Sequence, residues 1–302
     1  MIARFSGRSA HTFRIKNKPT PEGYKILSLC DSGYTYTFMF TSRVEKSNVD
    51  VIENVNKIGA EVYHLVGQLP SQKQFNIYMD NYFSSINLFS FLREKGIGAC
   101  GTVRTNTAKF PVILKKEKEK KNEWDFLKGV VIDNVLAMLW IDNGPVTMLT
   151  TIHNIDSKVS KERRRPRETS TNSKKIKSVF EGAARKILLI PKIIDDYNHH
   201  MGGVDIADQL RSYYSTQLTV CRTWPPLFFW LLDTSIINSY LICKKLGITK
   251  DHKSFRMDLI RVLIKDSAKN DNSFKRVTRS GKCDDDKQTD SIDVHENRSK
   301  KI

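Results

Sequence analysis

Four aspartates stand where a carboxylate could take part in chemistry. Asp31 follows the apolar run "YKILSLC", Asp80 follows "FNIYM", and Asp205 and Asp208 come directly after Gly202 and Gly203 in "YNHHMGGVDIADQLRSYYS". Mg²⁺ prefers oxygen ligands and keeps several waters, so aspartates from separate segments suit it. Two such ions about 3.5–4 Å apart can stabilise the attacking and the leaving oxygen of a phosphodiester together.

A simpler interpretation exists for the last two acids. Acidic residues are favoured at a helix N-terminus because the helix macrodipole is positive there. Asp205 and Asp208 would then only stabilise the start of a helix. In the metal interpretation, the glycines allow another segment to approach closely, and the carboxylates of Asp31, Asp80 and Asp205 converge in the folded chain.

The surrounding sequence predicts the strands and helices that would position these acids. Runs of β-branched and aromatic residues predict strands, and apolar residues at helical spacing predict helices, in the order β-β-α-β-α-β. The predicted ranges are 24–30, 34–40, 55–69, 75–80, 86–96 and 98–104. This order places Asp31 and Asp80 at the C-terminal ends of strands, where ligand-binding groups gather in α/β sheets.

Composition divides the chain into five regions. We expect a basic N-terminal arm, the first part of an α/β core, a β-rich insertion with flexible basic borders, a second, helical part of the core, and a disordered polar tail. The corresponding ranges are 1–23, 24–104, 105–190, 191–266 and 267–302. Within the helical part, helices are expected at about 204–215, 226–246 and 254–265.

The charge balance predicts a polyanionic partner. The chain carries 50 Lys and Arg against 33 Asp and Glu, a net charge of +17, which argues against an enzyme of small metabolites and favours nucleic acid. Arg163, Arg164 and Arg165 lie in "KERRRPR", which has the composition of a nuclear localisation signal and would also bind DNA backbone. Arg104, in "GTVRTN", is a candidate phosphate contact, with a surface salt bridge as the alternative.

Cysteines and apolar stretches bear on the setting of the chain. None of the five cysteines forms a C-x-x-C pair, so we expect neither a zinc ribbon nor a redox motif. Their odd number argues against a disulfide framework, and we expect a reducing, intracellular setting. The N-terminus lacks the apolar core of a secretory signal. The stretch 225–243 carries Asp233 and Asn238 and begins with two prolines, so we expect a mostly buried helix and no membrane partner.

Four blocks of the sequence together resemble the piggyBac-type DNA transposases, over about residues 4 to 245. They are "FSGRSAHTFRIKNKPTPEGYKILSLCDSGY", "YMDNYFSSINLFSFLREKGIGACGTVRTN", "LWIDNGPVTMLTTIH" and "YNHHMGGVDIADQLRSYYS". The resemblance implies an RNase H-like catalytic core interrupted by a β-rich insertion. It also implies cut-and-paste transposition of double-stranded DNA with Mg²⁺ (or Mn²⁺) in the nucleus. The catalytic, metal-binding aspartates of the family fall on Asp31, Asp80 and Asp205, and a fourth aspartate of its motif falls on Asp208.

Two departures from the family keep an alternative open. Family members usually have a long region before the first block and a cysteine-rich, zinc-binding module at the end, whereas here only residues 1–23 precede "YKILSLC" and Cys283 stands alone in the tail. A domesticated or truncated element-derived DNA-binding protein without transposition activity would fit these departures. The presence of all the catalytic acids favours an enzyme. The sequence does not decide between a transposase and a nuclease without end joining, nor does it show whether the chain forms a homodimer.

Overall fold

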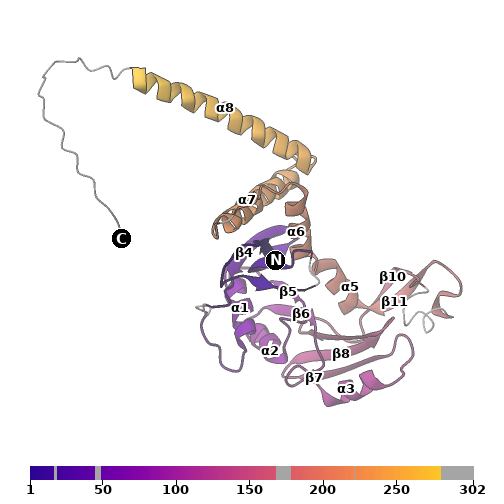
Figure 1. The fold of residues 1–302 in the computed structure, drawn as a ribbon. Helices are drawn as coiled ribbons and strands as arrows, with labels where there is room; N and C mark the ends of the chain where they lie inside the picture. The colour runs from indigo at the N-terminus through magenta and orange to yellow at the C-terminus, as the bar shows by residue number, and fades with distance from the viewer. Residues whose placement is uncertain (17–18, 45–48, 168–177, 221, 280–302) are drawn as a thin grey trace, which may run out of the picture. The chain divides into compact units, whose positions relative to one another are not determined.

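The computed structural model divides the chain into two compact units, Met1–Ile242 and Cys243–Ile302 (Figure 1). It describes residues 1–16, 19–44, 49–167, 178–220 and 222–279, with side chains described as far as residue 269. All of the described strands belong to the first unit. The four aspartates singled out by the sequence therefore lie in that unit as well.

An antiparallel sheet of four strands contains the strand that ends at Asp31. The C-terminal part of β3 (Glu22–Asp31) pairs with β4 (Tyr34–Phe40). Its N-terminal part pairs with β1 (Ile2–Arg4) on one edge and with β2 (Phe13–Arg14) on the other. The two strands predicted at 24–30 and 34–40 are thus confirmed as β3 and β4.

The expected N-terminal arm at residues 1–23 takes a different form. Its residues supply β1 and β2, and Ala3 and Phe5 are buried in an apolar cluster with Tyr24 and Trp230. The physical reason is that these apolar side chains have a place to pack against β3. The charge of the segment, which suggested an extended arm, lies on the exposed residues between them.

The next segment alternates helices and strands as the sequence predicts. α1 (Lys57–Val66), β5 (Asn76–Met79), α2 (Ile86–Glu94) and β6 (Gly98–Thr102) follow β4 in that order. The side chain of Ser85 accepts a hydrogen bond from the first turn of α2, as expected for an N-cap. β5 and β6 pair in parallel, which suits two strands joined through a helix.

The strands of the expected β-rich insertion extend the sheet that β5 and β6 begin. β7 (Leu127–Ile132), β8 (Val135–Ile141) and β9 (Pro145–Thr150) complete a five-stranded sheet in the order β5-β6-β9-β8-β7. β9 pairs antiparallel with β6, so residues 127–150 belong to the same sheet as the strand before Asp80. The predicted division at residue 105 does not describe this sheet.

The borders of that region also differ from the prediction. α3 (Val112–Glu119) makes the first charge run largely helical rather than flexible. β10 (Lys158–Arg164) and β11 (Arg185–Pro191) form a separate two-stranded sheet from part of the second charge run. The remainder of that run, residues 168–177, lies outside the described residues.

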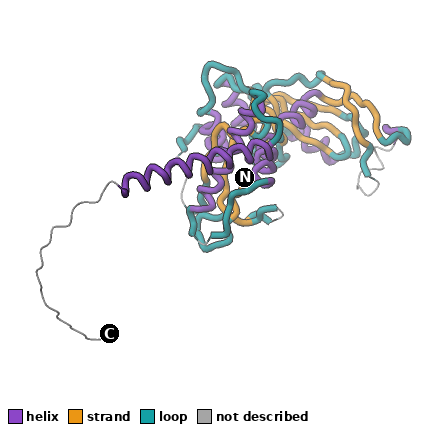
Figure 2. The backbone as a smooth tube through the Cα atoms, turned by 90° about the horizontal axis from the view of Figure 1, so that it is seen from above, coloured by secondary structure: helices purple, strands orange, loops and turns teal. Residues whose placement is uncertain are grey.

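Both faces of the five-stranded sheet are covered (Figures 1 and 2). Along β8, Val135, Ala137 and Leu139 are buried in the cluster that includes α1 and α2, whereas Met138 and Trp140 pack with Ile193 and Ile194 on the other side. Burial on both faces explains why "VLAMLWI" is a continuous apolar run instead of an alternating one.

Three helices complete the first unit and lead out of it. α5 (Lys192–His200) was not predicted, whereas α6 (Gly203–Tyr213) and α7 (Pro225–Lys245) confirm the helices expected at 204–215 and 226–246. Only 33% of the most apolar window of α7 is buried, so the expectation of a mostly buried helix is wrong. Among the described helices α7 is the one long and apolar enough to cross a membrane, by length and composition only, and helices of soluble cores pass the same test.

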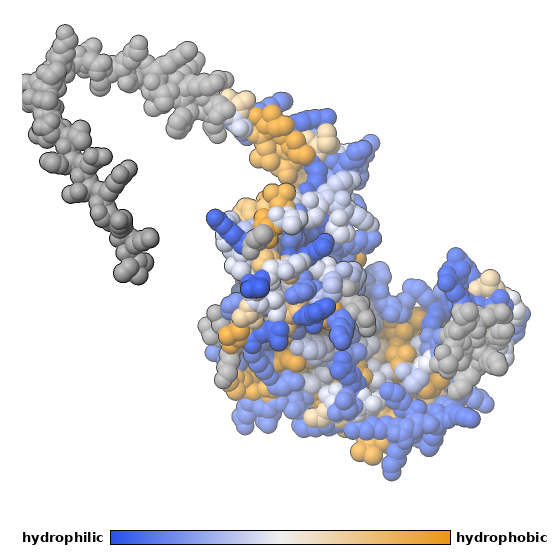
Figure 3. Space-filling model, viewed as in Figure 1, coloured by the Kyte–Doolittle hydropathy of each residue, from blue (hydrophilic) through white to orange (hydrophobic). Residues whose placement is uncertain are grey.

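The second unit is dominated by α8 (His252–Arg279), which continues past the helix expected at 254–265. The disordered tail expected from residue 267 is therefore wrong as far as residue 279, and residues 280–302 lie outside the described part of the chain. The sequence of α8 contains neither proline nor glycine, the residues that most strongly end a helix. Several of its apolar residues are exposed, namely Met257, Ile260, Val262, Leu263 and Ile264, and Figure 3 shows apolar surface on the described part of this helix.

Candidate functional site

The three aspartates with a predicted metal role come from three different elements. Asp31 is the last residue of β3, Asp80 directly follows β5, and Asp205 lies in the first turn of α6. All three are exposed. Carboxylates at strand ends and at a helix start can reach solvent and a substrate while their backbones are held by the sheets.

Gly203 brings the start of α6 against the end of β3. A Cβ atom at this position would lie 2.6 Å from the carbonyl oxygen of Cys30 and 3.5 Å from the Cα atom of Asp31. Contacts below 3 Å do not occur in real structures, so only glycine allows this approach. Gly33, which has a φ of +93°, turns the chain from β3 into β4 beneath Ile206. The glycine of the "GGVD" stretch thus places Asp205 beside the strand end that carries Asp31.

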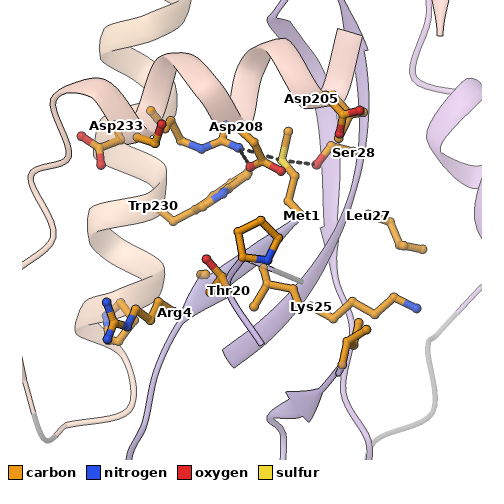
Figure 4. A pocket seen from close by; sticks show the side chains of 18 of the residues that line it. Met1, Arg4, Thr20, Lys25, Leu27, Ser28, Asp205, Asp208, Trp230 and Asp233 are labelled. Carbon is orange, nitrogen blue, oxygen red and sulfur yellow. Dashed lines mark hydrogen bonds and ion pairs between the residues drawn. The ribbon is translucent and has the colours of Figure 1, made fainter. Parts of the chain in front are cut away.

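A cavity of about 1630 Å³ opens between these elements. Asp80, Asp205 and Asp208 line it, and Asp31 is not among its lining residues. Figure 4 shows Asp205 and Asp208 projecting from α6 on one side of the cavity. The structure therefore brings two of the three predicted metal ligands, and the fourth aspartate, to one cavity.

The fit of these residues to a divalent metal is partial. Exposed carboxylates are the right donors for Mg²⁺ or Mn²⁺. However, among the His, Cys, Asp and Glu side chains of the described residues, no three form a group that could hold a metal ion. A finished three-ligand cage is not present in that part of the chain, and the metal role of Asp31, Asp80 and Asp205 stays a prediction.

Cys30 lies next to Asp31 but does not have the chemistry of a metal ligand. Burial raises the pKa of the Cys30 thiol above its ordinary value. The side chain therefore stays protonated at neutral pH, whereas a cysteine binds metal as the thiolate. Oxygen donors remain the relevant ones at this strand end.

Asp80 is held by its neighbours on two elements. Its Oδ1 accepts hydrogen bonds from the backbone N–H of Asn81 at 2.6 Å and from the hydroxyl of Thr102 at 3.5 Å. Thr102 in turn lies 3.4 Å from the hydroxyl of Tyr197 on α5. Burial raises the pKa of Tyr197, so this hydroxyl stays protonated and can donate. Sequence reasoning missed Thr102 and Tyr197, which only the tertiary structure places beside Asp80.

Asp208 differs from the other acids because it has a charged partner. Arg211, one helical turn further along α6, donates to its Oδ1 and is itself 7% exposed. The guanidinium of Arg211 also lies 5.3 Å from the centre of the Trp230 ring. Asp208 is thus part of an ion pair that neutralises a buried arginine. The i,i+3 spacing in "DQLR" was the signal that could have predicted this pair.

The arginines expected to contact DNA lie in two places. Arg104 lines the cavity and donates through Nε to Asn81 at 3.1 Å. On the β10–β11 hairpin, Arg163 is ion-paired with Asp142, Arg165 donates to the backbone of Gly182, and Arg164 is exposed. Arg104 therefore shares the cavity of the acids, and none of the three hairpin arginines lines it.

A comparison with known protein families places the chain among the transposases. A family model described as Transposase IS4 matches residues 1–240, and the chain belongs to this family. The likeness to piggyBac-type proteins is confirmed within it. The chain is 24% identical over 276 residues to the human (Homo sapiens) PiggyBac transposable element-derived protein 2, covering 87% of this chain and 43% of that protein.

A solved structure shares the fold. A piggyBac transposase in a synaptic complex with hairpin DNA, determined by cryo-EM, superposes with a TM-score of 0.65 at 24% identity, over 86% of this chain and 50% of that one. The mixed α/β fold expected from the sequence is confirmed at this level. The chain spans about half the length of the relatives that it matches.

Proposed function

We propose that the chain carries the catalytic part of a piggyBac-like transposase, which cleaves and joins DNA strands with Mg²⁺ or Mn²⁺. The observation that carries the proposal is that the acids lie close together. Asp80 and Asp205 line the same cavity, and the close packing of Gly203 places the start of α6 against the end of β3 at Asp31. Membership of the Transposase IS4 family supports the same chemistry. The core formed by β3 to β6 and α6 would be RNase H-like.

In this proposal Asp31, Asp80 and Asp205 would hold the divalent metal, and Asp208 would support them. Such an ion, when bound, activates a water or a 3′-hydroxyl and stabilises the departing oxygen. The ion pair of Asp208 with Arg211 favours the supporting role over direct ligation. Arg104 would bind a phosphate beside the acids, since its charged end lies next to Asn81 at the same cavity.

Double-stranded DNA is the proposed partner. The net charge of +17 supports it, and the solved relative is described as a synaptic complex with hairpin DNA. A homodimer that brings two DNA ends together belongs to the same proposal. The basic stretch "KERRRPR", which is exposed at Arg164 and Arg167, would direct the protein to the nucleus.

A second candidate is an element-derived DNA-binding protein without transposition activity. The human relative is described as element-derived, and the chain covers less than half of it. This candidate shares the DNA partner and differs only in chemistry. Nicking of DNA by the purified chain separates the two.

The test is a plasmid-nicking assay in Mg²⁺ or Mn²⁺ with Asp205→Asn. We expect the rate to fall by at least about 100-fold, because even residues behind a metal's direct ligands contribute about 10–100-fold. The free energy of unfolding should change by less than about 1 kcal/mol, since Asp205 is exposed. Detection of joined products on paired ends distinguishes a transposase from a nuclease.

Asp133→Asn is the matched control. Asp133 is an exposed acid that is not among the residues lining the cavity, and it is paired with Lys109. Its positive φ of 49° suits asparagine as well as aspartate. This variant should nick at the parental rate. Parental activity in Asp205→Asn would remove Asp205 from the site, and no nicking by the parent chain would favour the second candidate.

A further inference from the structure

Lys25 lines the same cavity as Asp80, Asp205 and Asp208. Its ammonium group lies 4.4 Å from the centre of the Tyr82 ring and donates to the Tyr82 hydroxyl at 3.1 Å. It also lies 5.7 Å from the centre of the Phe13 ring. Two aromatic residues from different elements thus fix a cation that the stem of a lysine would otherwise leave mobile.

No carboxylate among the described residues pairs with this ammonium group. The ring faces attract the cation but carry no net charge, so they position Lys25 without neutralising it. Tyr82 follows Asp80 by two residues, and both line the same cavity as Lys25. Tyr82, which positions the ammonium group of Lys25, is therefore only two residues from the catalytic candidate Asp80.

A second cation lies on the same face of the sheet. The register of β1 and β3 pairs Ile2 with Lys25 and Arg4 with Gly23, so Arg4 and Lys25 lie on one face of the sheet as diagonal neighbours, with Cα atoms about 7–8 Å apart. Gly23 between them has no side chain. Figure 4 shows Arg4 and Lys25 on the side of the cavity opposite Asp205 and Asp208.

We propose that Lys25, positioned by Tyr82 and assisted by Arg4, binds a backbone phosphate of the DNA strand that lies in this cavity. The inference deepens the proposed function and rests on it, because it takes the cavity to be the place where DNA is held. A phosphate is attracted to the wall formed by β1 and β3 and repelled by the carboxylates of α6. The strand therefore lies with a phosphate on the Lys25 side, and the site is distinct from the basic β10–β11 hairpin.

The experiment measures binding of a fluorescent 20-base-pair duplex by anisotropy between about 50 and 300 mM KCl, in EDTA so that no metal contributes. Each phosphate contact contributes about 0.9 to the slope of log K against log salt. Lys25→Gln should therefore lower the slope by about 0.9 and weaken binding roughly five- to ten-fold at 0.1 M salt. Lys25→Arg, which keeps the charge, should bind within about two-fold of the parent.

Lys95→Gln is the matched control. Lys95 also lies over an aromatic ring, 5.4 Å from the centre of Phe91, but it is outside the cavity. Its loss should change the affinity by less than about two-fold and leave the slope nearly unchanged. If Lys25→Gln behaves like Lys95→Gln, the phosphate site at Lys25 is overturned while DNA binding by the chain stands. If the parent shows no salt-dependent binding at all, the proposed DNA partner itself fails.

Tyr82→Leu tests the positioning role. If Tyr82 acts through Lys25, this change should weaken binding in the parent and add less than about two-fold in a Lys25→Gln background, because two residues that act as a unit are not additive. Full additivity would mean that Tyr82 contacts DNA by itself, and would overturn its assignment as the residue that positions Lys25. Circular dichroism of each variant confirms that the folded chain is being compared.

Discussion

At the scale of single residues, the ion pair of Asp208 and Arg211 allows a role of Asp208 in the stability of the fold to be distinguished from a role in metal binding. Arg211 is 8% exposed at its side chain and Asp208 is 46% exposed, so the two partners have different access to water. Removing the acid leaves a buried charge without its counter-ion. Removing the arginine leaves an acid that water can solvate.

Asp208→Asn should therefore destabilise the fold more than Arg211→Met does. We expect about 1–3 kcal/mol for Asp208→Asn, the range for a buried polar group that loses its partner. The methionine of Arg211→Met replaces the contact of the guanidinium with the Trp230 ring by a thioether–aromatic contact and leaves no buried charge, so its cost should be smaller. Urea unfolding in EDTA measures both, with Asp205→Asn as an exposed acid on the same helix for comparison.

The double variant completes that measurement. Once Arg211 is methionine, Asp208→Asn should cost little, because no buried charge remains to be neutralised. Equal costs of Asp208→Asn in both backgrounds would show that the ion pair contributes nothing to the fold. Asp208 would then be free to act as a metal ligand.

At the scale of elements, the packing of α6 on β3 decides whether the acids can meet. This packing depends on the missing side chain of Gly203, which faces the backbone of Cys30. The neighbouring Gly202 makes no such contact, since the nearest atom to an added Cβ is Ile206 Cδ1 at 3.9 Å. Adjacent glycines in one motif thus have different physical roles.

Gly203→Ala should push the start of α6 away from β3. An added Cβ 2.6 Å from a carbonyl oxygen forces a backbone shift, so the free energy of unfolding should fall by about 1–3 kcal/mol. DNA nicking should be lost as well, because Asp205 moves away from the end of β3. Gly202→Ala, at the N-cap with a φ of −75°, should cost less than about 1 kcal/mol. Equal stability and activity of the two variants would show that close approach is not the reason for the glycine pair.

At the scale of the whole molecule, the division into two units predicts that the first folds without the second. The chain contains four tryptophans, all before residue 231, so tryptophan fluorescence reports on the first unit alone. A chain that ends after Gly247 should unfold in urea with the same midpoint by fluorescence, and its free energy of unfolding should agree with that of the full chain within about 0.5 kcal/mol. Its helical circular dichroism signal should fall, because α8 is lost. A clear drop of the midpoint would show that the first unit depends on α8.

The sequence determined the local features of this protein. The order β-β-α-β-α-β and the strand-end places of Asp31 and Asp80 follow from periodicity and side-chain shape, which act between residues close in the chain. Such signals also carry the likeness to piggyBac-type transposases, since its motifs are short runs. They failed for α8, where a polar composition suggested disorder although nothing in the run interrupts a helix.

Only the tertiary structure decided which distant segments meet. It joined β9 to β6, so that residues 127–150 of the expected insertion became part of the five-stranded sheet, and it brought Lys25 to Tyr82 across 57 residues. Local pattern states which face of a strand or helix is apolar, but the partner of that face depends on how all the faces are buried together. For the same reason, the three acids were visible in the sequence, whereas the two opposed walls of the cavity became visible only in the folded chain.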